Sequence, residues 1–177
     1  LAHDVAGEAV LKCLDDENID SSYIDFSSGT TSCTIVLLEA GASKRTILSY
    51  NGVSSRSSQS LQAEDLDSIQ PDWLYAAGLD GDMETLLAFF EKAHQLKCKV
   101  MFNPGAAELA QSKKLIGLLE DVDVLLVNKA EAAQIVPGTI LTELLSRLAN
   151  YCKTVLITDG PMGAIATDHK KTYRLGI

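Results

Sequence analysis

The sequence lacks several features that mark particular classes of protein. No apolar run approaches the roughly 20 residues of a membrane span, and positive charge is scarce, with 15 Lys and Arg against 24 Asp and Glu. The formal charge of −9 argues against a nucleic-acid partner, which needs a basic face, and against anionic membrane surfaces. No two cysteines have the CxxC spacing and no histidine clusters with them, so a zinc site is not expected. We expect the cysteines to be reduced and buried in a cytoplasmic protein: Cys13, Cys33, Cys98 and Cys152.

What is present fits a globular protein. The chain has 177 residues, of which 46% are apolar and 22% are charged, and this is enough to bury a core. We therefore expect one domain over residues 1–177. The sequence begins at Leu1 rather than at Met, and residues 170–177 have the pattern of a strand that stops at Ile177. These observations predict that the chain is the central part of a longer protein.

The first third of the chain predicts a helix followed by a hairpin. Apolar residues recur at helical spacing over residues 5–16, and Asp4 precedes them as a cap. Residues 23–26, 32–39 and 45–50 have the composition of strands, and Gly41 lies in the short turn between the last two, which predicts a hairpin. The serine-rich and glycine-rich residues 51–60 form either a loop that binds a polar ligand or a solvated linker.

Strands and helices then alternate. A short helix is predicted at residues 63–69. Strands follow at residues 73–77, 99–102, 123–127 and 154–158, with helices at residues 83–95, 112–120 and 139–151 and from Lys129 onward. The alternation predicts βαβ units and a parallel sheet. An antiparallel pair, residues 164–167 with residues 172–175, is expected at the end of the chain.

Asn128 and Glu131 follow one of the predicted buried strands. They are three residues apart at the start of a helix, so both can face the same side of its first turn. The amide and the carboxylate suit a metal-bound phosphate, and Glu131 would act through Mg²⁺ because it would repel phosphate directly. The alternative is a capping box, with Asn128 as the cap and Glu131 at the third helical position.

The next predicted strand ends in Thr158-Asp-Gly-Pro-Met-Gly163. Glycines let backbone N–H groups approach an anion closely, and Thr158 adds a hydroxyl. The alternative is a simple turn with Pro161 at a favoured position. The segment is not a P-loop, because it has no Gly-Lys-Ser/Thr ending. Since ligands of open α/β sheets lie at the carboxyl ends of parallel strands, the two polar turns are expected side by side, which points to phosphoryl transfer.

Three further polar residues follow predicted strands. Asn103 either reaches the same edge or starts a turn with Pro104 and Gly105. Asp80 and Asp82 are candidate acids, although the helix that follows would use them as caps.

Taken in order, these segments resemble the ribokinase-like (phosphofructokinase B) carbohydrate kinase family over essentially the whole chain. The resemblance is carried by Asp4-Val-Ala-Gly7, Asn18-Ile-Asp20, the hairpin region up to Asn51-Gly52, Asn103-Pro104, Asn128-Lys-Ala-Glu131 and Thr158-Asp-Gly-Pro-Met-Gly163. It implies a three-layer α/β/α sandwich with a mostly parallel sheet and a small lid hairpin at about residues 31–50. It also implies ATP and Mg²⁺ as cofactors.

Roles for individual residues also follow from the resemblance. The nucleotide would contact Asn128, Thr158, Asp159, Gly160 and Gly163, and Glu131 together with Asn128 would organise Mg²⁺. Gly78 and Asn103 are the residues expected near the substrate. The hairpin would close over the sugar.

The sequence departs from the family at both ends. The amino-terminal Gly-Gly sugar-binding segment is absent, and so is the carboxy-terminal Gly-Ala-Gly-Asp segment. In the family the latter supplies an anion hole and the aspartate base, so no catalytic base is assigned here and it is expected beyond Ile177. The chain as it stands is predicted to be inactive.

The function expected from the resemblance is ATP-dependent phosphorylation of a sugar hydroxyl. Ala77-Gly78-Leu79 replaces the acidic sugar ligand typical of ribokinases, which weakens ribose as the substrate. The alternatives are a nucleoside kinase and a non-catalytic α/β binding domain on the same scaffold. The apolar hairpin either pairs two chains into a homodimer or folds onto its own domain.

Overall fold

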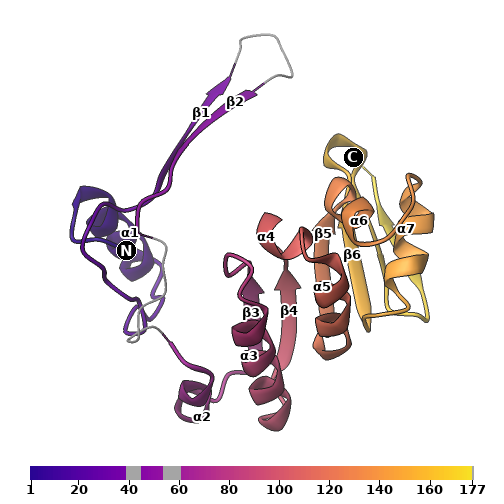
Figure 1. The fold of residues 1–177 in the computed structure, drawn as a ribbon, viewed down its shortest axis with the longest axis horizontal. Coiled ribbons are helices and arrows are strands. Elements are labelled where there is room, and N and C mark those ends of the chain that lie inside the picture. The colour runs from indigo at the N-terminus through magenta and orange to yellow at the C-terminus, as the bar shows by residue number, and fades with distance from the viewer. Residues whose placement is uncertain (39–44, 54–60, 177) are drawn as a thin grey trace. The chain divides into compact units, whose positions relative to one another are not determined.

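The computed structural model describes residues 1–38, 45–53 and 61–176, and its contacts divide the chain into two compact units, Leu1–Leu61 and Gln62–Ile177. Among the described residues, the smaller unit contains one helix and one hairpin, and the larger unit contains a six-stranded sheet with its helices (Figure 1). No helix in the described part of the chain is both long and apolar enough to cross a membrane.

Helix α1 (Val5–Asp16) begins where the sequence predicts. Asp4 caps it by accepting a hydrogen bond from the N–H of Gly7 at 2.8 Å. The same carboxylate accepts hydrogen bonds from the backbone N–H and the hydroxyl of Thr31, each at 2.8 Å. These hydrogen bonds, with the Thr31 N–H first, hold the pKa of Asp4 below its usual value. Asp4 therefore fixes both the start of α1 and the segment that leads to the hairpin.

The predicted hairpin is confirmed. Strands β1 (Cys33–Leu38) and β2 (Arg45–Tyr50) pair antiparallel, with Cys33 opposite Tyr50. Large apolar side chains on both of its faces are exposed: Ile35, Val36, Leu37, Leu38, Ile47, Leu48 and Tyr50. The turn at Gly41 and residues 54–60 of the serine-rich loop lie outside the described residues.

Two expectations for the smaller unit are wrong. Residues 23–26 form no strand, because no described strand lies alongside them, and the ring of Phe26 stacks on His3 instead with centroids 4.5 Å apart. Cys13 and Cys33 are exposed rather than buried, since nothing in the described structure covers their side of α1 and of the hairpin.

The other two cysteines are buried as predicted, in the larger unit. None of the four cysteines forms a disulfide. Burial raises the pKa of both Cys98 and Cys152, which keeps these two thiols protonated and unreactive.

The sheet of the larger unit has the strand order β3-β4-β5-β6-β7-β8. Strands β3 (Trp73–Ala77), β4 (Lys99–Asn103), β5 (Val124–Asn128) and β6 (Thr154–Thr158) are parallel, whereas β7 (Ala164–Thr167) and β8 (Thr172–Leu175) add as an antiparallel pair. This arrangement confirms the α/β fold with a mostly parallel sheet and a separate small hairpin.

Helical segments join these strands. Their bounds are η1 (Ala63–Asp65), α2 (Leu66–Ile69), α3 (Met83–Gln95), α4 (Ala106–Leu109), α5 (Ser112–Leu118), η2 (Leu119–Asp121), α6 (Lys129–Ile135), α7 (Leu141–Leu148) and η3 (Gly160–Met162). Helix α7 is shorter than the predicted residues 139–151, because Ile140 has extended backbone angles as its N-cap and the chain after Leu148 closes in turns. Helix α4 is not predicted from the sequence, because its four residues are too few to show a hydrophobic period.

The core lies between the helices and one face of the sheet. Helices α3, α5, α6 and α7 contact one another in that order and form one layer on the same face of the sheet (Figure 1). Alternate strand residues on that face are buried: Val100, Phe102, Leu125, Val127, Val155 and Ile157. The opposite face, with Tyr75, Met101 and Leu126, is half-buried to exposed in the described structure. Because β3, β4, β5 and β6 are parallel, their carboxyl ends lie at the same edge of the sheet, and this edge carries the candidate site.

Candidate functional site

The two polar turns singled out in the sequence lie side by side. In the parallel pair of β5 and β6, Asn128 is the register partner of Thr158, and each is the last residue of its strand. Asn128 is exposed and Thr158 is partly exposed. The predicted proximity of these turns at the carboxyl edge of the sheet is confirmed, whereas their roles toward a ligand stay predictions.

Asn128 and Glu131 form the capping box that the sequence offers as an alternative. The side-chain oxygen of Asn128 accepts a hydrogen bond from the N–H of Glu131 at 2.9 Å. In return, Oε2 of Glu131 accepts a hydrogen bond from the N–H of Asn128 at 2.8 Å. The box uses one oxygen of each side chain, so capping and ligand binding are compatible. Within the described residues, Oε1 of Glu131 has no hydrogen-bond partner.

The turn after β6 contains two glycines that serve different purposes. Gly160 has a φ of 51°, and a Cβ there would have open space around it. Gly163 has a φ of 90°, and a Cβ there would lie 1.9 Å from the carbonyl oxygen of Leu175. Gly163 is therefore required by its close contact with β8, whereas Gly160 leaves backbone accessible to a ligand.

Lys129 joins the two turns and was missed as a site residue in the sequence. Its Nζ lies 3.3 Å from Oδ2 of Asp159, and both side chains are partly exposed. An acidic group beside a phosphate site would repel the ligand, and the lysine offsets that charge. The signal was present, since Lys129 stands inside the Asn128-Lys-Ala-Glu131 motif.

The expected substrate residues lie at the ends of the neighbouring strands. The side-chain amide of Asn103, at the end of β4, donates a hydrogen bond to the carbonyl of Leu126 at 2.8 Å. Gly78 follows β3 and packs closely on Gly105, because a Cβ at Gly78 would lie 2.8 Å from the N and Cα atoms of Gly105. Both residues therefore join neighbouring loops at the same edge, and contact with a substrate stays a prediction.

Asp82 is a cap rather than a free acid. Its carboxylate accepts hydrogen bonds from the N–H of Thr85 at 3.0 Å and from the Thr85 hydroxyl at 2.6 Å. Asp80 is exposed in the turn before it, with a φ of 52°.

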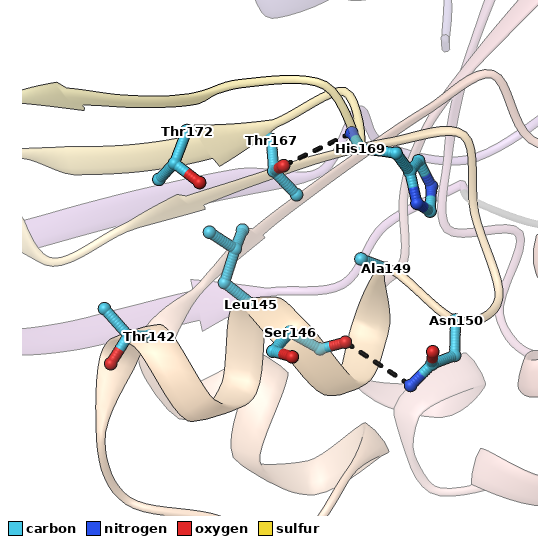
Figure 2. Close-up of a pocket in the computed structure, with 8 residues that line it drawn as sticks. All are labelled: Thr142, Leu145, Ser146, Ala149, Asn150, Thr167, His169 and Thr172. Carbon is cyan, nitrogen blue, oxygen red and sulfur yellow. Dashed lines mark hydrogen bonds between the residues drawn. The ribbon is translucent and has the colours of Figure 1, made fainter.

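Two pockets of the larger unit flank α7. A pocket of about 340 Å³ lies between α7 and the turn after β7, and Figure 2 shows Ser146 and Asn150 on one wall and Thr167 and His169 on the other. Thr167 pairs with Val155 near the start of β6, so this pocket is at the opposite edge of the sheet from Thr158.

The second pocket lies beside the Gly163 turn. It has a volume of about 440 Å³ and is lined by residues that include Ile140 and Leu141 at the start of α7, Met162 and Ala164 around the turn, and Leu175. Its walls are mainly apolar side chains, and it adjoins the turn that carries Gly160.

The described residues contain no cluster of three or more His, Cys, Asp or Glu that would hold a metal ion by themselves. Mg²⁺ differs from zinc in this respect, because proteins often hold it through one or two carboxylates together with substrate phosphates. Glu131, with one carboxylate oxygen outside the capping box, fits that mode of binding.

Solved structures of other proteins share this fold. A probable sugar kinase from Rhizobium etli CFN 42 matches with a TM-score of 0.81 at 18% identity, covering 99% of this chain and 56% of that protein. Anopheles gambiae adenosine kinase, solved with P1,P4-di(adenosine-5) tetraphosphate, matches with a TM-score of 0.81 at 14% identity, covering 100% and 57%. Halothermothrix orenii fructokinase matches with a TM-score of 0.78 at 16% identity, covering 99% and 66%. The fold is thus that of ribokinase-like sugar and nucleoside kinases.

A comparison with family models assigns the chain to one protein family. The model of the pfkB family carbohydrate kinases matches residues 1–176, and the chain belongs to this family. The chain spans about three fifths of the length of the structures it matches. A search of curated protein sequences gave no match.

Proposed function

We propose that the protein transfers the γ-phosphoryl group of ATP to a hydroxyl of a sugar. The observation that carries the proposal is the register pairing of Asn128 with Thr158, which brings two polar turns together at the carboxyl edge of a parallel sheet. Ligands of open α/β sheets bind at that edge. Membership of a carbohydrate kinase family supports phosphoryl transfer as the reaction.

The residues of the β6 turn would contact the nucleotide. Thr158 is partly exposed and Gly160 is exposed, and hydroxyl and backbone N–H groups can donate hydrogen bonds to phosphate oxygens. Lys129 holds Asp159 in an ion pair and so limits repulsion of the phosphates. The apolar pocket beside this turn offers room for the base of the nucleotide.

Glu131 and Asn128 are the residues proposed to hold Mg²⁺. When bound, the ion would neutralise charge on the phosphates and orient them. The capping box keeps Glu131 in one rotamer, so its second oxygen is presented in a fixed position without a conformational change.

The acceptor is proposed to bind at the ends of β3 and β4, near Gly78 and Asn103. A sugar is favoured by the family. A nucleoside is the second candidate, because the matching structures include an adenosine kinase from Sinorhizobium meliloti and a nucleoside kinase from Burkholderia thailandensis solved with inosine. A non-catalytic binding domain on the same scaffold is the third.

Release of ADP by the full-length protein, measured with ATP, Mg²⁺ and a panel of sugars and nucleosides, tests the proposal. ADP release that depends on a sugar is the expected result. Release with nucleosides alone would favour the second candidate. ATP binding without turnover on any acceptor would leave the non-catalytic domain and contradict phosphoryl transfer.

A further inference from the structure

Glu108 is a completely buried carboxylate that lies outside the residues proposed to bind nucleotide, metal and acceptor. Its exposure is 0%, and it lies in the short helix α4 that follows β4. Oε1 accepts hydrogen bonds from the N–H groups of Leu79 at 2.8 Å and of Gly81 at 2.7 Å. Oε2 accepts one from the N–H of Gly105 at 2.9 Å. The carboxylate therefore joins the loop after β3 to the loop after β4.

The hydrogen bonds from these three N–H groups offset the loss of hydration that the Glu108 carboxylate undergoes on burial. No lysine, arginine or histidine in the described part of the chain forms an ion pair with it. Burying an ionised carboxylate is unfavourable unless its hydrogen bonds are made, and a leucine would fill a similar volume without that penalty. A directional acceptor does what a leucine cannot do, which is to fix three backbone N–H groups of two loops.

Glycines on both loops make room for the carboxylate. A Cβ at Gly78 would lie 2.5 Å from Oε2 of Glu108, and a Cβ at Gly105 would lie 2.9 Å from the same atom. Gly81 has a φ of 83°, which turns its N–H toward Oε1 at little steric cost. The loops and the buried acid thus fit one another.

The loops that Glu108 joins belong to the candidate site. Gly105 stands two residues after Asn103, whose amide bonds the carbonyl of Leu126 on β5. Leu126 stands two residues before Asn128. A continuous set of hydrogen bonds and strand ends therefore runs from the loop after β3 to the capping box after β5.

We propose that Glu108 is a positioning residue for the acceptor side of the site. By holding the loops after β3 and β4 together, it fixes Gly78 and Asn103 in the arrangement that receives the acceptor. This inference rests on the proposed function, because it assumes an acceptor at that edge. The geometry of the two loops does not depend on that assumption.

Glu108→Gln tests the loop geometry without any catalysis. An amide has one acceptor oxygen, so either Gly105 or the pair Leu79 and Gly81 loses its partner. A hydrogen bond to a charged group stabilises the closed loop, so an amide that loses this bond should exchange with deuterium about tenfold faster. Amides in the middle of β5 should exchange at the wild-type rate. The matched control is Glu84→Gln, which removes the same charge from the exposed first turn of α3.

Kinetics of the same variants test the positioning role. In the full-length protein, Glu108→Gln should raise KM for the acceptor about tenfold while KM for ATP stays within about twofold. Glu108→Asp keeps the charge but is too short to reach both loops, so it should not restore the acceptor KM. Glu84→Gln should leave both constants unchanged.

Two results would overturn the inference. Unchanged exchange at Leu79, Gly81 and Gly105 in Glu108→Gln would show that the carboxylate does not hold the loops. Equal increases of both KM values would show that the residue acts only on the general stability of the sheet. Failure of the wild-type protein to use any acceptor would refute the proposed function, and faster exchange in the variant would then still support the loop geometry.

Discussion

At the scale of single residues, Glu131 has a structural role in the capping box of α6 and is also the residue proposed to hold Mg²⁺. Glu131 caps α6 through Oε2, and Asn128 completes the reciprocal pair. Capping boxes are common, so this geometry alone says nothing about function. The pairing of Asn128 with Thr158 on the next strand is what makes the box part of a candidate phosphate site.

Glu131→Gln separates the two roles. Glutamine keeps an acceptor for the N–H of Asn128, so the melting temperature should be close to that of the wild type. Loss of the charge should raise the Mg²⁺ concentration needed for half-maximal ADP release about tenfold or more. Glu120→Gln, an exposed substitution in η2, is the control and should change neither quantity. An unchanged Mg²⁺ requirement in Glu131→Gln would refute the metal role.

Single residues also show where prediction from the sequence reaches its limit. The Asn128 and Thr158 turns were identifiable because polar residues and glycines follow apolar runs directly. The role of Glu108 was not, since its three partners lie three to 29 residues away on two loops. Only the folded chain brings Leu79 and Gly105 to the same carboxylate.

At the scale of elements, boundaries in the larger unit follow the hydrophobic pattern closely. Strands β3 and β6 and helix α3 have the predicted limits. The predictions fail where the period is short or absent, as in α4, or where tertiary neighbours decide, as in residues 23–26. A strand needs a partner to form its ladder, and the composition of a single segment does not reveal one.

Asp123 connects three strands at the amino edge of the sheet. Its carboxylate accepts hydrogen bonds from the N–H of Val100 at 2.8 Å and from Nζ of Lys153 at 2.7 Å. Burial acts to raise the pKa of Asp123, but the Lys153 hydrogen bond, the Val100 hydrogen bond and the charge of Lys153 together lower it. A depressed pKa in the folded state means that the charged form stabilises the fold.

Asp123→Asn should therefore destabilise the protein in a pH-dependent way. At pH 7 we expect a loss of about 1–2 kcal/mol in the free energy of unfolding, from weakened hydrogen bonds to a charged group. Below about pH 4 the carboxyl of the unfolded state becomes protonated, and the stabilisation is lost as the pH falls through the lowered pKa of the folded state, so the difference should shrink. Urea unfolding at several pH values measures this. Asp67→Asn, which breaks an exposed ion pair with Lys92, should have little effect at any pH. A pH-independent loss in Asp123→Asn would contradict the assignment.

At the scale of the whole molecule, the hairpin is the least explained part. An isolated two-stranded hairpin is marginally stable in water, and this one exposes apolar side chains on both faces. Such a surface favours burial against another protein surface. We propose that two chains pair through the face that contains the cross-strand pair Ile35 and Leu48.

The double variant Ile35→Glu/Leu48→Glu tests this pairing. Placing like charges opposite each other on that face should convert a dimer to a monomer, as measured by size-exclusion chromatography with light scattering. Thr34→Glu, on the opposite face of β1, is the control and should leave the dimer intact. A wild-type protein that is monomeric at all concentrations would contradict the proposal.

The fold and the family follow from the whole chain, whereas the choice of substrate does not. The order and spacing of the motifs predicted the fold and the family, because both are properties of the complete pattern. We propose that a few side chains at the ends of β3 and β4 select the substrate, and sugar and nucleoside kinases share the same scaffold. A pattern of strands and helices does not distinguish between them.

Nucleotide binding at the Thr158 turn is tested most directly by the affinity for ATP in the presence of Mg²⁺, measured by calorimetry on the wild type, Thr158→Val and Thr154→Val. The two threonines lie at opposite ends of β6 on the same face, so the variants alter the same strand equally. We expect Thr158→Val to weaken binding about tenfold, through loss of a hydrogen bond to a phosphate, and Thr154→Val to bind as the wild type does. Equal affinity in all three proteins, or no binding by the wild type, would contradict nucleotide binding at this turn.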